Sequence, residues 1–224
     1  MEEIQVVVIG DEKVGKSSMI STLVSQHFSD KVPAILHDVH LPIEDEESSD
    51  TMTSILDTSS RSEDFSTVLQ QIKTAHAILL IYDITRIETF NRLSSFWLPM
   101  IHKTALHAPP ITIVGNKLDL RSSNTTTTSM TTIRSKQSSN NKTQITTSGC
   151  EELQVLVAPL MARYPSIEAC LECSAKSVLN IHQAFFLAQK TVLYPIDPLF
   201  DMKTSVRIRS IYDIIEYTDC TMSE

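Results

Sequence analysis

The residues best suited to chemistry form a short loop near the start of the chain. Gly10 to Ser17 is GDEKVGKS, a G-x-x-x-x-G-K-S pattern that follows the apolar run IQVVVI. In such a pattern the backbone N–H groups, here Glu12 to Lys16, wrap phosphate oxygens, aided by the N-terminus of the next helix. Lys16, taken as an exposed loop residue, would reach the terminal phosphates, and the Ser17 hydroxyl would ligate Mg²⁺. The loop therefore predicts a nucleotide phosphate site; a coincidental strand–turn–helix is the alternative.

A second metal ligand is expected at the end of another strand. Asp57 closes the apolar run SILD. A carboxylate at the carboxyl end of a strand, opposite the phosphate loop, is where a direct or water-mediated Mg²⁺ partner lies. We therefore predict Ser17 and Asp57 as the metal site, although many strands end in Asp and the position depends on the motifs around it.

Two further motifs indicate which base is bound. The tetrapeptide NKLD starts at Asn116, directly after the run ITIVG, and CSAK starts at Cys173. Asp119 can accept hydrogen bonds from the guanine ring N–H and its exocyclic amino group, which adenine does not offer in that arrangement. Lys117 can lie over the base, Asn116 can tie this loop to the phosphate loop, and the Ala175 N–H can donate to guanine O6. These motifs favour guanine and disfavour an ATP-using kinase.

The expected ligand is thus GTP or GDP with Mg²⁺, held by four separate segments. The predicted nucleotide-contacting residues are Glu12, Lys13, Val14, Gly15, Lys16, Ser17, Ser18, Asp57, Asn116, Lys117, Asp119, Ser174, Ala175 and Lys176.

The order of these motifs resembles the Ras-type small GTPase superfamily across about residues 4–193. The resemblance implies a P-loop NTPase (small GTPase) fold of the α/β class, with a mostly parallel sheet, one antiparallel edge strand and helices on both faces. Phe28 matches the aromatic residue that edges the base in that superfamily, with a plain core phenylalanine as the alternative.

A closer resemblance is to the N-terminal GTPase domain of the mitochondrial Rho GTPases, the Miro family. It is carried by SFWLPMI and by ECSAKSVLNIHQAFFLAQKTVLYPIDPLF, including the paired Pro195 and Pro198. It implies a slow GTPase switch in mitochondrial distribution and morphology, with protein adaptors or regulators as partners. It also implies a place on the cytosolic face of the mitochondrial outer membrane when the domain is part of a full-length protein.

Several residues depart from the superfamily pattern. Ser60 stands where a glycine meets the γ-phosphate, and Arg61 stands where a glutamine orients the attacking water. Glu12 replaces a preferred glycine, and Ala34 lies about where a metal-capping threonine belongs. Lys16 and Arg61 are the predicted catalytic residues. Arg61 is either a solvated arginine or an internal arginine finger, and a non-catalytic, nucleotide-bound interaction module is the alternative function.

The elements that must position these residues follow from the hydrophobic pattern. Apolar runs alternate with helical patterns, which predicts a doubly wound α/β sheet. We expect strands near 4–10, 38–43, 51–57, 77–84, 111–119 and 169–175, and helices near 16–28, 89–101, 151–163 and 180–192. Helix 16–28 would bury Val24 and Phe28 on one face, and Pro42 favours a sheet edge for the second strand.

The domain boundaries follow from composition. Residues 1–200 are expected to form the GTPase domain and 201–224 a divergent tail with no EF-hand loop or membrane span. In 122–148, 16 of 27 residues are Ser or Thr, which predicts a disordered insertion. Cys220 lies one place too early for prenylation.

Composition excludes or disfavours several other kinds of function. A formal net charge of −8 over 224 residues argues against general nucleic-acid binding. No apolar run approaches the ~20 residues of a membrane helix, so a soluble, cytoplasmic chain is expected. Cys170 and Cys173 form a lone spaced pair, which favours reduced core thiols over a zinc site.

Overall fold

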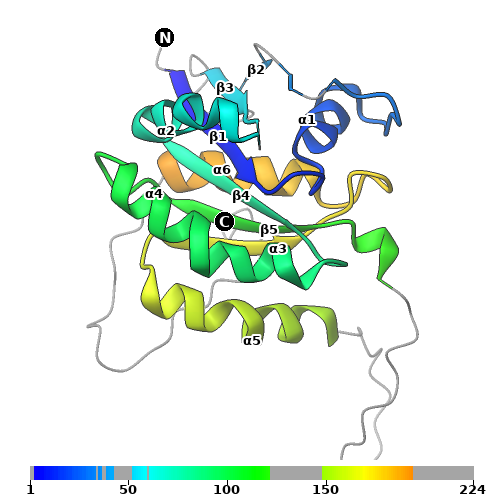
Figure 1. Cartoon of the computed structure of the whole chain (residues 1–224). Helices are drawn as coiled ribbons and strands as arrows, with labels where there is room; N and C mark the ends of the chain where they lie inside the picture. Colours follow the sequence, from blue (N-terminus) through cyan, green and yellow to red (C-terminus); the bar gives the residue numbers. More distant parts are fainter. Residues whose placement is uncertain are drawn as a thin grey trace, which may run out of the picture.

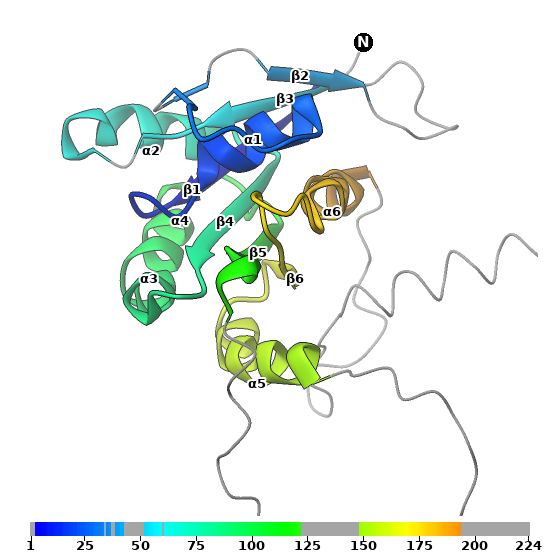
Figure 2. The same cartoon turned by 90° about the vertical axis from the view of Figure 1, so that its right-hand side faces the viewer.

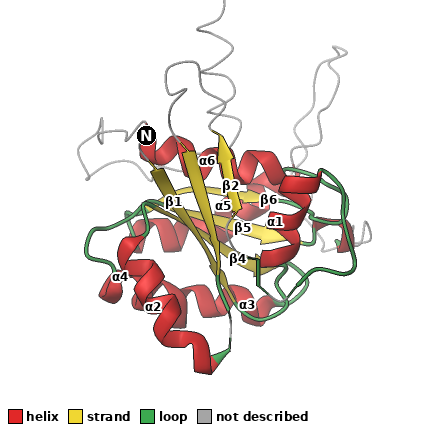
Figure 3. Ribbon diagram, turned by 90° about the horizontal axis from the view of Figure 1, so that it is seen from above, coloured by secondary structure: helices red, strands yellow, loops and turns green. Residues whose placement is uncertain are grey.

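A central sheet of six strands organises the chain in this computed structural model, which describes residues 3–33, 35–36, 39–42, 52–59, 61–121 and 148–193. The strand order is β2-β3-β1-β4-β5-β6, with all six strands labelled in Figure 2 and the same sheet seen from two other sides in Figures 1 and 3. The strands are β1 (Glu3–Gly10), β2 (Val39–Pro42), β3 (Met52–Asp57), β4 (Ala77–Asp83), β5 (Ile111–Asn116) and β6 (Ile167–Glu172). Every pairing is parallel except that of β2 with β3, so the predicted fold class is confirmed and Pro42 lies on an edge strand.

Helices cover both faces of this sheet. The helices α1 (Lys16–Ser25) and α6 (Ile181–Leu193) lie on one face. The other face carries α2 (Phe65–Thr74), α3 (Ile87–Arg92), α4 (Leu98–Thr104) and α5 (Ser148–Arg163). Figure 2 shows the strands between α6 and the α3–α4 pair. This two-sided cover explains why the central strands are nearly continuous apolar runs.

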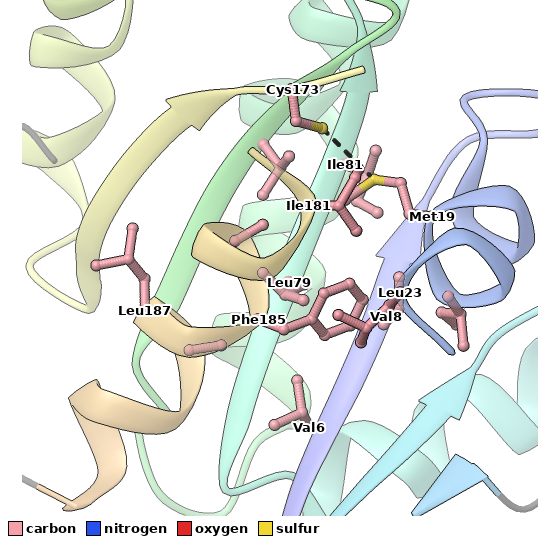
Figure 4. Close-up of a cluster of buried hydrophobic side chains, with 14 of the residues drawn as sticks. Val6, Val8, Met19, Leu23, Leu79, Ile81, Cys173, Ile181, Phe185 and Leu187 are labelled. Atoms are coloured by element: carbon pink, nitrogen blue, oxygen red, sulfur yellow. Dashed lines mark hydrogen bonds between the residues drawn. The ribbon is translucent and has the colours of Figure 1, made fainter. Parts of the chain in front are cut away.

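The alternation of side chains along β1 builds the two cores. Val6 and Val8 pack towards α1 and α6, whereas Val7 and Ile9 pack towards α2 and α4. All four side chains are fully buried. Figure 4 shows Phe185 of α6 lying against strand residues of the first core. With both faces of β1 fixed, the loop that follows its last residue starts from a rigid position.

Several element boundaries differ from the sequence prediction. The first helix ends at Ser25, because Gln26 adopts a left-handed conformation and its N–H bonds to Thr22 O. Val24 lies within this helix but is 57% exposed, so the prediction that it is buried was wrong. Phe28 lies beyond the helix, half-buried against the first core.

Other boundaries moved for similar local reasons. The strand expected over 111–119 stops at Asn116, because Lys117 has a left-handed φ of 72° and a 3-10 turn, Leu118–Leu120, follows. The last strand spans 167–172 rather than 169–175. The helix that precedes it, α5, begins at Ser148 rather than at 151.

Two helical segments were missed or simplified. The single helix expected over 89–101 is α3, a π-helical turn at Leu93–Trp97, and α4. The helix α2, which follows a 3-10 turn at Ser62–Asp64, was not predicted from the sequence. Val68 and Ile72 of α2 are buried four residues apart, so the helical period was present in the sequence.

Some predictions fall on residues outside the described part of the chain. These are the interpretations of Ala34 and Ser60, the insertion up to residue 147, the paired prolines and the tail. Among the described residues, no helix combines the length and apolarity that a bilayer crossing requires. The same residues hold no cluster of three metal-ligating side chains, and Cys170 and Cys173 are both buried.

Candidate functional site

The phosphate loop connects β1 to α1 and depends on its two glycines. Gly10 has φ 152°, and a Cβ there would lie 2.2 Å from the backbone oxygen of Ile81. Gly15 has φ 99°, and a Cβ there would lie 2.3 Å from Asn116 Nδ2. No other side chain fits either place without moving backbone or the Asn116 amide. The loop is therefore held tightly against β4 and β5.

Lys16 is buried in this loop, at 7% exposure, and the expectation of an exposed lysine was wrong. Its Nζ donates to Gly10 O and Asp11 O, both at 3.1 Å. Burial lowers the pKa of Lys16, while Asp57, Asp11 and Glu12 act to raise it. The loop's own carbonyls thus hold a fixed cation beside the N-terminus of α1.

The two predicted metal ligands are in direct contact. Ser17 Oγ donates a 2.6 Å hydrogen bond to Asp57 Oδ2, and the Leu36 N–H donates to the same oxygen at 3.0 Å. The other oxygen, Asp57 Oδ1, is buried and accepts no hydrogen bond from the residues that the structure describes. Burial raises the pKa of Asp57, against hydrogen bonds from Ser17 and Leu36 that lower it. A buried carboxylate oxygen without a donor fits a cation, so these residues suit Mg²⁺.

Asn116 joins three loops with one side chain. Its Nδ2 donates to Val14 O in the phosphate loop at 2.9 Å, which is the tie that the sequence predicted. Its Oδ1 accepts the N–H groups of Lys117 at 2.8 Å and Ala175 at 3.2 Å. The Ala175 N–H is thus already engaged in this structure, and its contact with guanine O6 stays a prediction.

The remaining base-loop residues lie beside Asn116. Asp119 is exposed, and its Oδ1 accepts a 2.5 Å hydrogen bond from the buried Ser174. Lys176 is also exposed. The ammonium of Lys117 lies 2.7 Å from Asp83 Oδ2, so it is paired with a carboxylate of β4. The NKLD and CSAK loops are therefore side by side, as guanine recognition by both would require.

A cavity of about 310 Å³ opens over the phosphate loop. It is lined by Glu12, Lys13, Gly15, Lys16, Ser17, Ser18, Val32, Pro33, Ile35, Thr58, Ser59, Arg61 and Asp64. The cavity brings the predicted phosphate-binding residues together with Arg61 and with the segment that precedes β2. Val14 is fully buried and does not line this cavity.

The sequence pattern described as "Ras family" matches residues 5–194. The chain belongs to the Ras family. It is similar to Mitochondrial Rho GTPase 1 of Arabidopsis thaliana, with 37% identity over 200 residues, 89% of this chain and 27% of that protein. Mitochondrial Rho GTPase 1 of Mycosarcoma maydis is 34% identical over 92% of this chain and 24% of its own length. Mitochondrial Rho GTPase 1 of Caenorhabditis elegans is 30% identical over 91% of this chain and 28% of its own length.

The chain spans about a quarter of the length of these curated relatives. The chain is a Ras-family domain, and its six-stranded, mostly parallel sheet agrees with that family. Ras-family GTPases bind guanine nucleotides and in general use Mg²⁺.

Two residues that depart from the family pattern face solvent. The Glu12 side chain is 74% exposed, with its carboxylate 3.8 Å from the Lys13 ammonium. The Arg61 side chain is 69% exposed, with its guanidinium 3.8 Å from the carboxylate of Glu63. The Glu12 side chain is therefore largely in solvent, although Glu12 also lines the cavity over the phosphate loop.

Sequence reasoning missed three residues that support the phosphate loop. Asp11 accepts hydrogen bonds from Arg92 Nε at 2.9 Å and from Trp97 Nε1 at 2.8 Å. Asp83 pairs with Lys117, and Arg86 donates to Glu12 O at 2.9 Å. Asp83 had a usable signal, because it ends a buried strand at the edge of the sheet where the site lies.

Proposed function

We propose that this Ras-family domain binds GTP and GDP with Mg²⁺ and hydrolyses GTP slowly to GDP and phosphate. The observation that carries the proposal is the side chain of Asn116, which bonds Val14, Lys117 and Ala175 at once. One residue thereby aligns the loop suited to phosphates with the two loops suited to guanine. A nucleotide that spans these loops would contact both ends of a single rigid unit.

The phosphate end of the proposed site combines three kinds of group. Backbone N–H groups from Glu12 to Ser18 and the N-terminus of α1 favour anionic oxygens. Lys16 supplies a buried cation. Mg²⁺, when bound by Ser17 and Asp57, would neutralise charge on the phosphates. Positioning and charge neutralisation are most of what catalysis of phosphoryl transfer requires.

The base end of the proposed site is built on Asp119. Its carboxylate, held by Ser174, would accept both guanine N–H groups. The stem of Lys117 would lie along the base while its ammonium stays with Asp83. Ala175 and Lys176 would complete this end through the backbone.

Slow hydrolysis follows from Arg61. A guanidinium has no acceptor, so it cannot orient an attacking water as a glutamine does. Arg61 is exposed and lies close to Glu63, which supports a solvated role rather than that of an internal arginine finger. We treat Lys16 as the principal charged group for the chemistry.

The cellular proposal rests on the names of the relatives. Proteins called mitochondrial Rho GTPases match about nine-tenths of this chain. We infer that the domain, proposed as residues 1–200, acts as a switch in mitochondrial distribution and morphology. Its place would be the cytosolic face of the mitochondrial outer membrane within a longer protein, with protein adaptors or regulators as partners.

Multiple-turnover phosphate release from GTP tests the proposal. The expected rate is roughly 10⁻⁴ to 10⁻³ per second with Mg²⁺, as for unassisted Ras-type proteins. Asp57→Ala is the matched control for contaminating GTPases and should release no phosphate above buffer. Tight GTP binding with no turnover would instead identify a nucleotide-bound interaction module.

A further inference from the structure

We propose that Asp83 and Arg86 are positioning residues that lock the guanine loop to the phosphate loop and thereby slow nucleotide release. The inference rests on the proposed nucleotide site. It adds a second connection between the loops, independent of Asn116. Neither residue was among the predicted site residues, and neither lines the cavity over the phosphate loop.

Asp83 occupies the right place for this role. It is the last residue of β4 and pairs in register with Asn116, the last residue of β5. Its side chain is 1% exposed, yet it is a carboxylate. A charge so deeply buried requires partners in the folded chain, because an unpaired one would be strongly destabilising.

The carboxylate of Asp83 receives two donors on each oxygen. The N–H and hydroxyl of Thr85 donate to Oδ1 at 2.9 and 2.6 Å. Arg86 Nε and Lys117 Nζ reach Oδ2 at 3.0 and 2.7 Å. Burial alone would raise the pKa of Asp83, but the bonds from Lys117, Thr85 and Arg86 lower it to about 2. The group is therefore ionised at neutral pH and holds the Lys117 ammonium in place.

Arg86 extends this contact to the phosphate loop. While its Nε binds Asp83, its Nη2 donates to the backbone oxygen of Glu12 at 2.9 Å. A planar guanidinium can hold both acceptors at once, which a lysine cannot. The chain of contacts therefore runs from Lys117 through Asp83 and Arg86 to Glu12, 74 residues away from Arg86 in the sequence.

The contact with Glu12 O orients a peptide bond of the phosphate loop. In a planar trans peptide, the C=O of one residue and the N–H of the next point in opposite directions. When Arg86 holds the Glu12 carbonyl, the Lys13 N–H points away from Arg86. Lys13 lines the cavity over the phosphate loop, and Arg86 lines a neighbouring cavity of about 580 Å³ instead. We infer that Arg86 turns the Lys13 N–H towards the phosphates.

Release of a fluorescent GDP, chased with excess unlabelled GDP, tests the positioning role in the full chain. Arg86→Ala removes both contacts and should release GDP at least tenfold faster than the unmutated protein. Arg86→Lys keeps the charge but can make only one of the two contacts at a time, so its GDP release rate should lie between those of the unmutated protein and Arg86→Ala. Arg163→Ala, an exposed arginine at the end of α5, is the matched control and should change the rate less than twofold.

A double-mutant cycle separates positioning from general destabilisation. If Asp83 and Arg86 act as one unit, the Asp83→Asn, Arg86→Ala double variant should release GDP no faster than the faster single variant. The thermal midpoint of the nucleotide-free Arg86→Ala protein should equal that of Arg163→Ala. Should Asp83→Asn fail to fold, the Arg86 series alone decides, because that side chain is half-exposed.

The outcomes distinguish this inference from the proposed function. If the unmutated protein retains labelled GDP and Arg86→Ala releases GDP at a rate within twofold of it, only the positioning role is overturned. The positioning role is also overturned if the fold increases in the GDP release rate caused by Asp83→Asn and by Arg86→Ala multiply in the double variant. An unmutated protein that binds no guanine nucleotide overturns the proposed function and this inference with it.

Discussion

Ser17 Oγ and Asp57 Oδ2 lie 2.6 Å apart, although the two residues are 40 positions apart in the sequence. Two oxygens on one octahedral Mg²⁺, each at 2.0–2.1 Å, lie about 3 Å apart. The pair is therefore already near the spacing that a shared metal imposes. The strand β3 brings Asp57 to the start of α1, where Ser17 stands, because β3 runs parallel to β1.

Asp57→Asn should have opposite effects on stability and binding. Burial raises the pKa of Asp57 in the folded chain. Ionised Asp57 therefore lowers the stability of the fold: the loss is absent below the pKa of the unfolded chain, and it is complete above the raised pKa of the folded chain. Neutral pH lies above the ordinary pKa of an aspartate, so a cost of ionisation is present there. In EDTA the variant should therefore unfold at a higher temperature than the unmutated protein.

With Mg²⁺ present, the same variant should bind GTP at least tenfold more weakly, because a carboxylate ligand is lost. Thermal unfolding in EDTA and nucleotide titration in Mg²⁺ measure the two effects. A lower midpoint in EDTA, or equal GTP affinity in Mg²⁺, would contradict the assignment of Asp57 as a buried metal ligand.

Lys16→Ala should weaken triphosphate binding by tenfold or more, which is about 1.4 kcal/mol. The chain should still fold, because burial makes the charged form of Lys16 unfavourable and its removal relieves that cost. Titration with a labelled GTP analogue and a thermal melt check both statements. Lys73→Ala, an exposed lysine of α2, is the control. GTP affinity equal to that of this control would remove Lys16 from the phosphate site.

Asp119→Asn should shift the preference from guanine to xanthine nucleotides. An amide can donate to the carbonyl that xanthine has in place of the guanine amino group. The loss for GDP should be on the order of 2 to 4 kcal/mol. Competition between xanthosine and guanosine diphosphates measures the change. GDP affinity that stays the same in the variant would show that Asp119 does not contact the base.

Arg61→Gln tests whether the arginine takes part in hydrolysis. Because Arg61 is exposed beside Glu63, we expect single-turnover hydrolysis to speed up or remain the same. A tenfold slower rate would mean that Arg61 contributes about 1.4 kcal/mol to the transition state. That result, or a rate near one per second in the unmutated protein, would assign Arg61 as an internal arginine finger.

The parts of the site that could be predicted are those encoded locally. The phosphate loop, NKLD and CSAK each place their polar groups within a few residues, directly after buried strands. The parallel sheet follows from the apolar runs, so the meeting of these loops at one edge could also be predicted. The tie from Asn116 to Val14 is confirmed on this basis.

The contacts that could not be predicted depend on the exact placement of distant side chains. Whether Lys16 is buried, and whether Lys117 pairs with Asp83, depends on loop shapes set by positive φ angles at Lys13, Gly15 and Lys117. Of these residues, only the glycine signals such a conformation in the sequence. The contact from Arg86 to Glu12 joins two elements that no local pattern connects.

The most direct test of the account is displacement of a fluorescent GDP from the purified, unmutated protein in Mg²⁺. We predict that unlabelled GDP and GTP displace it at near-stoichiometric concentrations, whereas ATP fails to do so at hundredfold excess. We expect Asp119, held by Ser174, and Asn116, bound to Val14, to make this difference. If ATP displaces the label as well as GTP does, the site is not a guanine-nucleotide site and the proposed GTPase function is wrong.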